Sequence, residues 1–164
     1  MNDAAPLLDR ESALASDTKL ELKVWLRLLT CTTLIERDVR QNLRERFDTT
    51  IARFDLLSQL DRAPKGLTMG ELSSRLMVTN GNVTGLTDAL VREGLVSRAP
   101  EPDDRRSLRI RLTATGKQSF DAMTPVHEGW IDRLMAGLTR AEMAHLLELL
   151  GRLKQSLAAA GAQK

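Results

Sequence analysis

The sequence predicts a mainly α-helical fold that contains one small two-stranded β-hairpin. Apolar residues make up 42% of the 164 residues but aromatic residues only 3%, so aliphatic side chains must fill the core. Most of these lose little rotamer freedom in a helix. Apolar positions also recur at three- and four-residue spacing along most of the chain. One short stretch, residues 108–112, instead alternates apolar and charged residues, which is typical of a strand with one buried face.

The N-terminal third predicts one helix of unusual length. Residues 1–16 are small and polar and are expected to form a frayed lead-in. No proline or glycine interrupts residues 17–47. The apolar residues of this segment share one helix face at positions Leu28, Cys31, Ile35, Val39 and Leu43.

The middle of the chain predicts several short elements in close succession. A helix over residues 49–60 ends before the turn Pro64-Lys65-Gly66. Thr68 and Glu71 have capping-box spacing, which predicts the start of a short helix over residues 69–77. The remaining expected elements are a turn at 78–80, a helix at 81–93 ended by a left-handed Gly94, a strand at 95–97, a polar loop at 99–107 and a strand at 108–112.

The C-terminal part predicts a helix from about residue 114, with a break near Thr124-Pro125 or at Gly137. Thr139 and Glu142 form a second capping-box pair. The apolar residues that follow have heptad-like spacing, at Met143, Leu146, Leu150, Leu153 and Leu157. A small domain cannot cover so long an apolar seam, so we expect a second copy of the chain to pack on it.

A helix, a tight turn, a second helix and a hairpin follow each other in the order of a winged helix-turn-helix. The second helix of that motif enters the DNA major groove with its first turn, and the hairpin loop contacts the duplex beside it. We therefore expect one domain over residues 1–164, with dimerisation helices at 17–47 and 114–160 around a winged helix-turn-helix at 49–113. The candidate DNA-contacting residues are Thr68, Thr79, Asn80, Gly81, Asn82 and Thr84, with Asp104, Arg105 and Arg106 in the hairpin loop.

These residue types suit contacts with duplex DNA. An asparagine can bond bidentately to adenine, and threonine hydroxyls and helix N-terminal amides suit phosphate oxygens. A glycine costs a helix roughly 1 kcal/mol relative to alanine, and close approach to DNA would compensate for Gly81 and Gly85. An arginine at the hairpin tip can enter a narrow minor groove. Five arginines and three acids lie between Arg98 and Arg111, although the whole chain has a net charge of only +2.

The segment from Leu67 to Gly116 resembles the MarR (multiple antibiotic resistance regulator) family. The matching residues are Leu67-Thr68, Glu71-Leu72, Leu76, Val83-Thr84, Asp88, Leu90, Gly94-Leu95-Val96, Arg98, Asp104-Arg105-Arg106, Leu112-Thr113 and Gly116. The chain departs from the family at Gly85, where an arginine is common. The resemblance implies an intertwined homodimer on a pseudo-palindromic operator, with half-sites about 34 Å apart. It also implies a repressor that is released by a small aromatic acid or related anion, bound between the dimerisation helices and the DNA-binding lobe.

Five residues are candidates for such an effector site. They are Trp25, Arg37, Arg40, Phe47 and Arg53. Similarity to regulators of aromatic catabolism suggests a hydroxycinnamate-type acid or an aryl-coenzyme A thioester. Two simpler interpretations remain open: Trp25 fills the dimer core, and the arginines belong to a solvated, salt-bridged helix face.

Two other functions remain possible at this point. One is a winged-helix module that binds protein and not DNA. The other is a thiol-based redox-sensing repressor that acts through Cys31, although its place on the apolar stripe favours a buried, inert thiol. No catalytic triad, phosphate loop or metal-ligand spacing is found, so we expect no enzyme activity, cofactor or metal. One cysteine, no signal peptide and no apolar run of membrane-spanning length favour a cytoplasmic protein.

Overall fold

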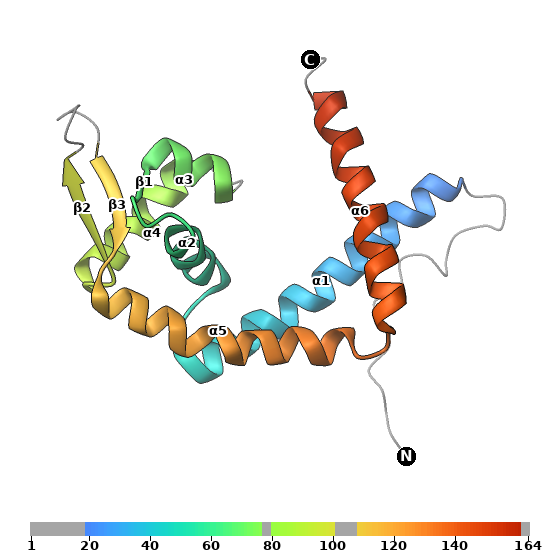
Figure 1. The fold of residues 1–164 in the computed structure, drawn as a ribbon, viewed down its shortest axis with the longest axis horizontal. Coiled ribbons are helices and arrows are strands. Elements are labelled where there is room, and N and C mark those ends of the chain that lie inside the picture. The colour runs from blue at the N-terminus through green and yellow to red at the C-terminus, as the bar shows by residue number, and fades with distance from the viewer. Residues whose placement is uncertain (1–18, 77–79, 101–107, 162–164) are drawn as a thin grey trace. The chain divides into compact units, whose positions relative to one another are not determined.

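The computed structural model describes residues 19–76, 80–100 and 108–161 (Figure 1). The chain divides into two compact units, Met1–His127 and Glu128–Lys164, and each is described by itself. Among the described residues, no helix combines the length and the apolar character that crossing a membrane requires. The first unit contains all the strands and the short helices of the described chain, and helix α5 passes through the boundary between the units.

Helix α1 (Leu20–Phe47) runs without interruption for 28 residues, which confirms the long helix predicted from the sequence. It ends at Asp48, which has the left-handed φ of 47° and turns the chain sharply toward the next helix. On the predicted apolar face, Val39 and Leu43 are buried, but Cys31 is exposed. The prediction of a buried thiol is therefore wrong, because the fully buried part of this stripe begins only at Val39.

Helix α2 (Ile51–Asp61) lies at the centre of the first unit. The hydroxyl of Thr50 caps it by accepting a hydrogen bond from the backbone N–H of Arg53 at 3.3 Å. Its buried side chains meet those of α1, the other short helices and the sheet. This core consists of Val39, Leu43, Phe54, Leu56, Leu57, Leu60, Leu67, Leu72, Val83, Leu90, Val96, Ile110, Phe120 and Met123.

The sheet has three antiparallel strands in the order β1-β3-β2, with β1 at Leu67–Thr68, β2 at Val96–Pro100 and β3 at Leu108–Leu112. The predicted β2–β3 hairpin is confirmed, although β2 extends beyond residue 97 to Pro100. Strand β1 was not predicted, because two residues are too few to show an alternating pattern. Its partner Ile110 also pairs with Arg98, so β3 lies between the other two strands.

Helix α5 (Ala114–Met135) continues through Pro125, so the prediction of a break at Thr124-Pro125 is wrong. The alternative at Gly137 is confirmed, since the chain leaves helical geometry after Met135 and re-enters it at α6 (Arg140–Gly161). The second capping box is also confirmed. The Thr139 N–H donates to the Glu142 carboxylate at 2.8 Å, and the Glu142 N–H donates to the Thr139 hydroxyl at 3.3 Å. The hydrogen bond from the Thr139 backbone holds the pKa of Glu142 below its ordinary value.

The joint between the hairpin and α5 is built on one hydroxyl and one glycine. The Thr113 hydroxyl donates to the carbonyl oxygen of Gly94 at 2.6 Å and accepts from the N–H of Gly116 at 2.9 Å. A Cβ at Gly116 would lie 1.8 Å from the carbonyl oxygen of Leu95. The close approach of these two backbone segments therefore requires glycine at position 116.

We predict that Gly116→Ala lowers the free energy of unfolding by about 3 kcal/mol, because the methyl group forces apart two backbone segments. Urea denaturation followed by circular dichroism measures this loss. Gly70→Ala is the matched control, since nothing lies within 4 Å of a Cβ there. It should leave stability unchanged or raise it by up to about 1 kcal/mol. Equal stability of the two variants would contradict the packing at this joint.

Candidate nucleic-acid interface

Helix α3 (Met69–Leu76) opens the helix-turn-helix and is held by the first capping box. The backbone N–H of Thr68 donates to the Glu71 carboxylate at 2.7 Å, and the Glu71 N–H donates to the Thr68 hydroxyl at 3.2 Å. These bonds confirm the predicted helix start. They also lower the pKa of Glu71, with the backbone N–H of Thr68 as the largest cause. Thr68 therefore has a structural role as the cap of α3.

Helix α4 (Asn80–Arg92) is the second helix of the motif and begins one residue before the predicted start. Val83, Thr87 and Leu90 are fully buried on one face. The Thr87 hydroxyl donates to the carbonyl oxygen of Val83 at 2.7 Å, so this polar group is satisfied inside the core. Asn82, Thr84 and Gly85 are exposed. One helix thus carries a buried apolar face and an open polar face.

The structure places only some of the predicted DNA-contacting residues. Asn82 and Thr84 are exposed in the first turns of α4, and the backbone of Asn80 and Gly81 starts that helix. Thr79 lies outside the described residues, as do the hairpin-loop residues Asp104, Arg105 and Arg106.

Three arginines of the hairpin strands make contacts inside the chain. Arg98 forms an ion pair with Asp88 of α4 at 2.5 Å. Arg109 donates to the carbonyl oxygen of Gly66 at 3.0 Å, and Arg111 donates to that of Lys65 at the same distance. These contacts tie the base of the hairpin to α4 and to the turn before β1. From the sequence, the three arginines are interpreted only as local positive charge, because their partners lie far away along the chain.

Among the described residues of the first unit, two hollows lie near the joint between α1 and α2. The larger has a volume of about 480 Å³ and is lined by Glu36, Arg40, Arg44, Thr49, Thr50, Ile51, Ala52, Asp55, Leu76 and Leu86. The smaller has a volume of about 230 Å³ and is lined by Phe47, Asp48, Thr49, Arg53, Leu57, Glu93, Leu95, Ser119 and Met123. The five predicted effector residues do not share one site. Arg40 lines the larger hollow, Phe47 and Arg53 line the smaller, and Trp25 and Arg37 line neither.

The larger hollow combines charged groups with apolar walls. Arg40 is 3.7 Å from Glu36, and both side chains are exposed, so this ion pair is weak. Burial raises the pKa of Asp55, while the positive charge of His127 opposes that shift. The sequence did not indicate Asp55, Leu76 or Leu86 as lining residues, since they reach the hollow from three different helices. Trp25 is 57% exposed in this chain.

The capped α3, the amphipathic α4 and the hairpin tied to it define a winged helix-turn-helix. The sequence profile of the MarR family matches residues 47–107. The HTH-type transcriptional regulator YkoM of Bacillus subtilis is 34% identical over 116 residues, which are 70% of this chain and 73% of YkoM. The transcriptional repressor YetL of the same organism is 34% identical over 106 residues, 64% of each chain.

Solved structures agree with these sequence matches. A mutant MarR of E. coli complexed with operator DNA superposes with a TM-score of 0.73 and 30% identity. The match covers 84% of this chain and 99% of that chain. The chain belongs to the MarR family. It is accordingly a DNA-binding transcriptional regulator and not an enzyme.

We predict that Asn82→Ala removes most of the sequence preference of DNA binding, with a loss of about 5- to 150-fold in specific affinity per half-site, because each bidentate side chain–base pair contributes about 1–3 kcal/mol of discrimination. Non-specific binding and its dependence on salt should persist, since phosphate contacts carry both. Gel-shift titrations at several salt concentrations, with operator and with unrelated duplex DNA, measure the specific and the non-specific affinity. Gln118→Ala is the matched control, because it removes an exposed carboxamide from α5. Wild-type sequence preference in Asn82→Ala would disprove the base contact.

Proposed function

We propose that this chain is a repressor that binds a pseudo-palindromic operator as a homodimer and is released by a small aromatic acid. The observation that carries the proposal is the exposed polar start of α4. Its opposite face is buried, and the hairpin is tied to it through Asp88 and Arg98. A recognition helix needs this arrangement, since it must present its first turn to base edges while the protein core holds its other face.

Specific contacts come from α4 and the hairpin loop in this proposal. Asn82 bonds to adenine, and Thr79, Thr84 and the N-terminal amides of α4 bond to phosphates. Gly85 supports a close approach to DNA, because a Cβ there would have nothing within 4 Å and no contact in the described chain requires glycine. Arg105 and Arg106 enter the minor groove, and Asp104 orients them by pairing.

The homodimer is supported by the apolar seam of α6. Leu146, Leu150 and Leu153 are 40%, 39% and 38% exposed, and no residue of α6 is buried in this chain. A long stripe of leucines does not stay open to water without cost, because burying a leucine contributes roughly 1.5–3 kcal/mol. A second copy of the chain covers this seam. It also covers the exposed Leu20, Val24 and Trp25 of α1.

We predict that Leu150→Asp combined with Leu153→Asp dissociates or unfolds the dimer, since charges would replace the centre of an apolar interface. Light scattering and circular dichroism measure the two outcomes. Ala144→Asp combined with Gln155→Asp is the matched control, because helical spacing puts these exposed positions on the opposite face of α6. A folded dimer of the Leu150/Leu153 variant would count against the seam.

The effector site in this proposal is the larger hollow. Its volume of about 480 Å³ fits an aromatic acid, for which Leu76, Leu86 and Ile51 supply the apolar walls. Arg40 and Arg44 supply the positive charge that binds a carboxylate. An aryl-coenzyme A thioester would have to leave most of its nucleotide portion outside this space, so we favour the free acid.

We predict that an aromatic acid raises the melting temperature of the wild-type protein, because a ligand at a hundred times its Kd stabilises the folded state by about 2.7 kcal/mol. Arg40→Met should remove this shift. Arg37→Met is the matched control, since Arg37 is exposed on the same helix and lines neither hollow. An equal shift in all three proteins would place the ligand elsewhere.

Two alternatives have distinct outcomes in these experiments. A protein-interaction module would not bind duplex DNA, so it would show no DNA affinity that falls steeply with salt, as several phosphate contacts require. A redox-sensing repressor is favoured by the exposure of Cys31, since an oxidant must reach the thiol. Release of the operator by peroxide, lost in Cys31→Ser, would support that alternative over release by an acid.

A further inference from the structure

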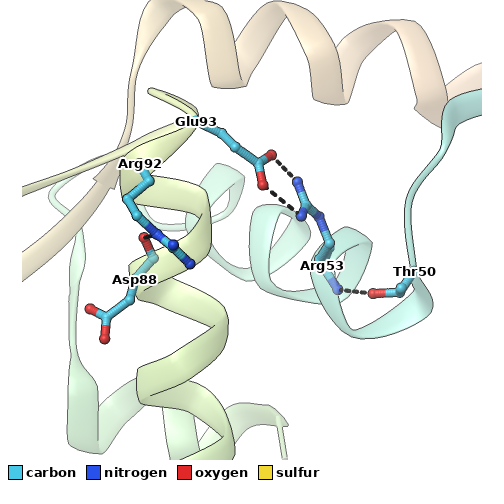
Figure 2. A network of polar contacts seen from close by, with 5 residues as sticks. All are labelled: Thr50, Arg53, Asp88, Arg92 and Glu93. Atoms are coloured by element: carbon cyan, nitrogen blue, oxygen red, sulfur yellow. Dashed lines mark hydrogen bonds and ion pairs between the residues drawn. The ribbon is translucent and has the colours of Figure 1, made fainter.

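The C-terminal end of α4 is joined to α2 by a bidentate ion pair. One guanidinium nitrogen of Arg53, Nη1, donates to Oε1 of Glu93 at 2.8 Å, and the other, Nη2, contacts Oε2 (Figure 2). The two residues lie 40 positions apart in the sequence. The contact therefore connects two separate helices of the winged domain.

Both partners occupy positions that the backbone holds firmly. The backbone N–H of Arg53 donates to the capping hydroxyl of Thr50, in the first turn of α2 (Figure 2). Glu93 directly follows the last residue of α4, and its N–H donates to the carbonyl oxygen of Ala89 at 3.1 Å. The next residue, Gly94, has a φ of 72° and starts the turn into β2. The ion pair thus fixes the chain at the point where α4 ends and the turn into the hairpin begins.

The geometry of this ion pair indicates that it orients α4 relative to α2 more than it adds to the free energy of unfolding. The Arg53 and Glu93 side chains are 22% and 44% exposed, and ion pairs open to water contribute about 0–1 kcal/mol. Two parallel hydrogen bonds between planar groups nevertheless restrict the angle between α2 and α4, the helices joined by the pair. The same hydrogen bonds lower the pKa of Glu93, so the carboxylate is charged at neutral pH.

Small tilts of α4 have large effects at its other end. A helix of 13 residues is about 20 Å long, so a tilt of about 10° at Glu93 moves the first turn by about 3 Å. That displacement equals the length of a hydrogen bond. The Asp88–Arg98 pair joins α4 to β2, so the helix and the hairpin are linked to each other. The Arg53–Glu93 pair then links both to α2.

We propose that Arg53 and Glu93 are positioning residues for operator recognition. They set the angle of α4 and the hairpin relative to α2, and neither contacts DNA. Without the pair, α4 samples a range of angles around its buried face, and its first turn meets the base edges less often. Phosphate contacts tolerate such motion better than base contacts do, since charge attraction depends less on direction. The inference rests on the operator binding proposed above.

A double-mutant cycle tests this role. We expect Arg53→Met and Glu93→Gln each to lower specific operator affinity about tenfold, within the usual range for coupling between sites. Non-specific affinity, its salt dependence and the urea midpoint should stay near wild type. The double variant should be no worse than either single variant, because the pair is lost in each. Arg53→Lys should recover little affinity, since an ammonium group lacks the planar fork.

Arg92→Met is the matched control, because it removes an arginine charge next to Glu93 and leaves the pair intact. It should keep specific affinity near wild type. Unchanged specific affinity in Arg53→Met, or additive losses in the double variant, would overturn the proposal. The salt dependence of DNA affinity gives a further test. If its slope falls in Arg53→Met by the amount expected for one phosphate contact, the proposal is overturned, since Arg53 would then contact DNA.

A measurement without DNA separates this inference from the proposed function. Residual dipolar couplings of the free protein report the orientation of α4 relative to α2. We expect Glu93→Gln to change or broaden that orientation and Arg92→Met to leave it as in the wild type. An unchanged orientation in Glu93→Gln overturns the positioning role even where operator binding is established. Failure of the wild type to prefer any duplex sequence overturns the operator proposal alone.

Discussion

The winged domain depends on the burial of one face of α4. Val83, Thr87 and Leu90 are fully buried and meet a core made by α1, α2, α3 and the sheet. This burial stabilises α4, which contains the exposed Gly85 and would have little stability as an isolated helix. Because the apolar contacts lie on one side only, the other side keeps Asn82 and Thr84 open to water. The same packing therefore holds the helix and leaves its polar face exposed to solvent.

Burial alone leaves the orientation of such a helix loosely set, since apolar contact has no preferred direction. Directional contacts at the C-terminal end of α4 supply what burial lacks. The Thr113 hydroxyl bonds to the carbonyl of Gly94, and the ion pairs of Glu93 and Asp88 reach α2 and β2. All three lie away from the first turn of α4. The polar residues that stabilise the geometry are thus separate from those that we propose contact DNA.

Much of the local structure was predictable because it depends on residues close together in the chain. Both capping boxes, the left-handed Gly94 and the helix over 20–47 follow from spacing and backbone preference. The helix through Pro125 was harder to predict, since proline usually weakens a helix but neighbouring contacts can outweigh its cost. Strand β1 exists only because β3 passes beside it. Cys31 shares an apolar stripe with buried residues but is exposed. Periodicity does not indicate where along a helix the packing of neighbouring elements ends.

By itself, the sequence determined the order of the elements, the polar first turn of α4 and the resemblance to MarR regulators, because these reside in short-range patterns and fixed spacings. Only the tertiary structure decided which side chains share a site. It assigned Arg40 and Arg53 to different hollows and paired Arg53 with Glu93 across 40 residues. It also engaged the hairpin arginines in internal contacts. The reason is physical: a charged side chain reveals its partner only when folding brings distant segments within hydrogen-bond distance.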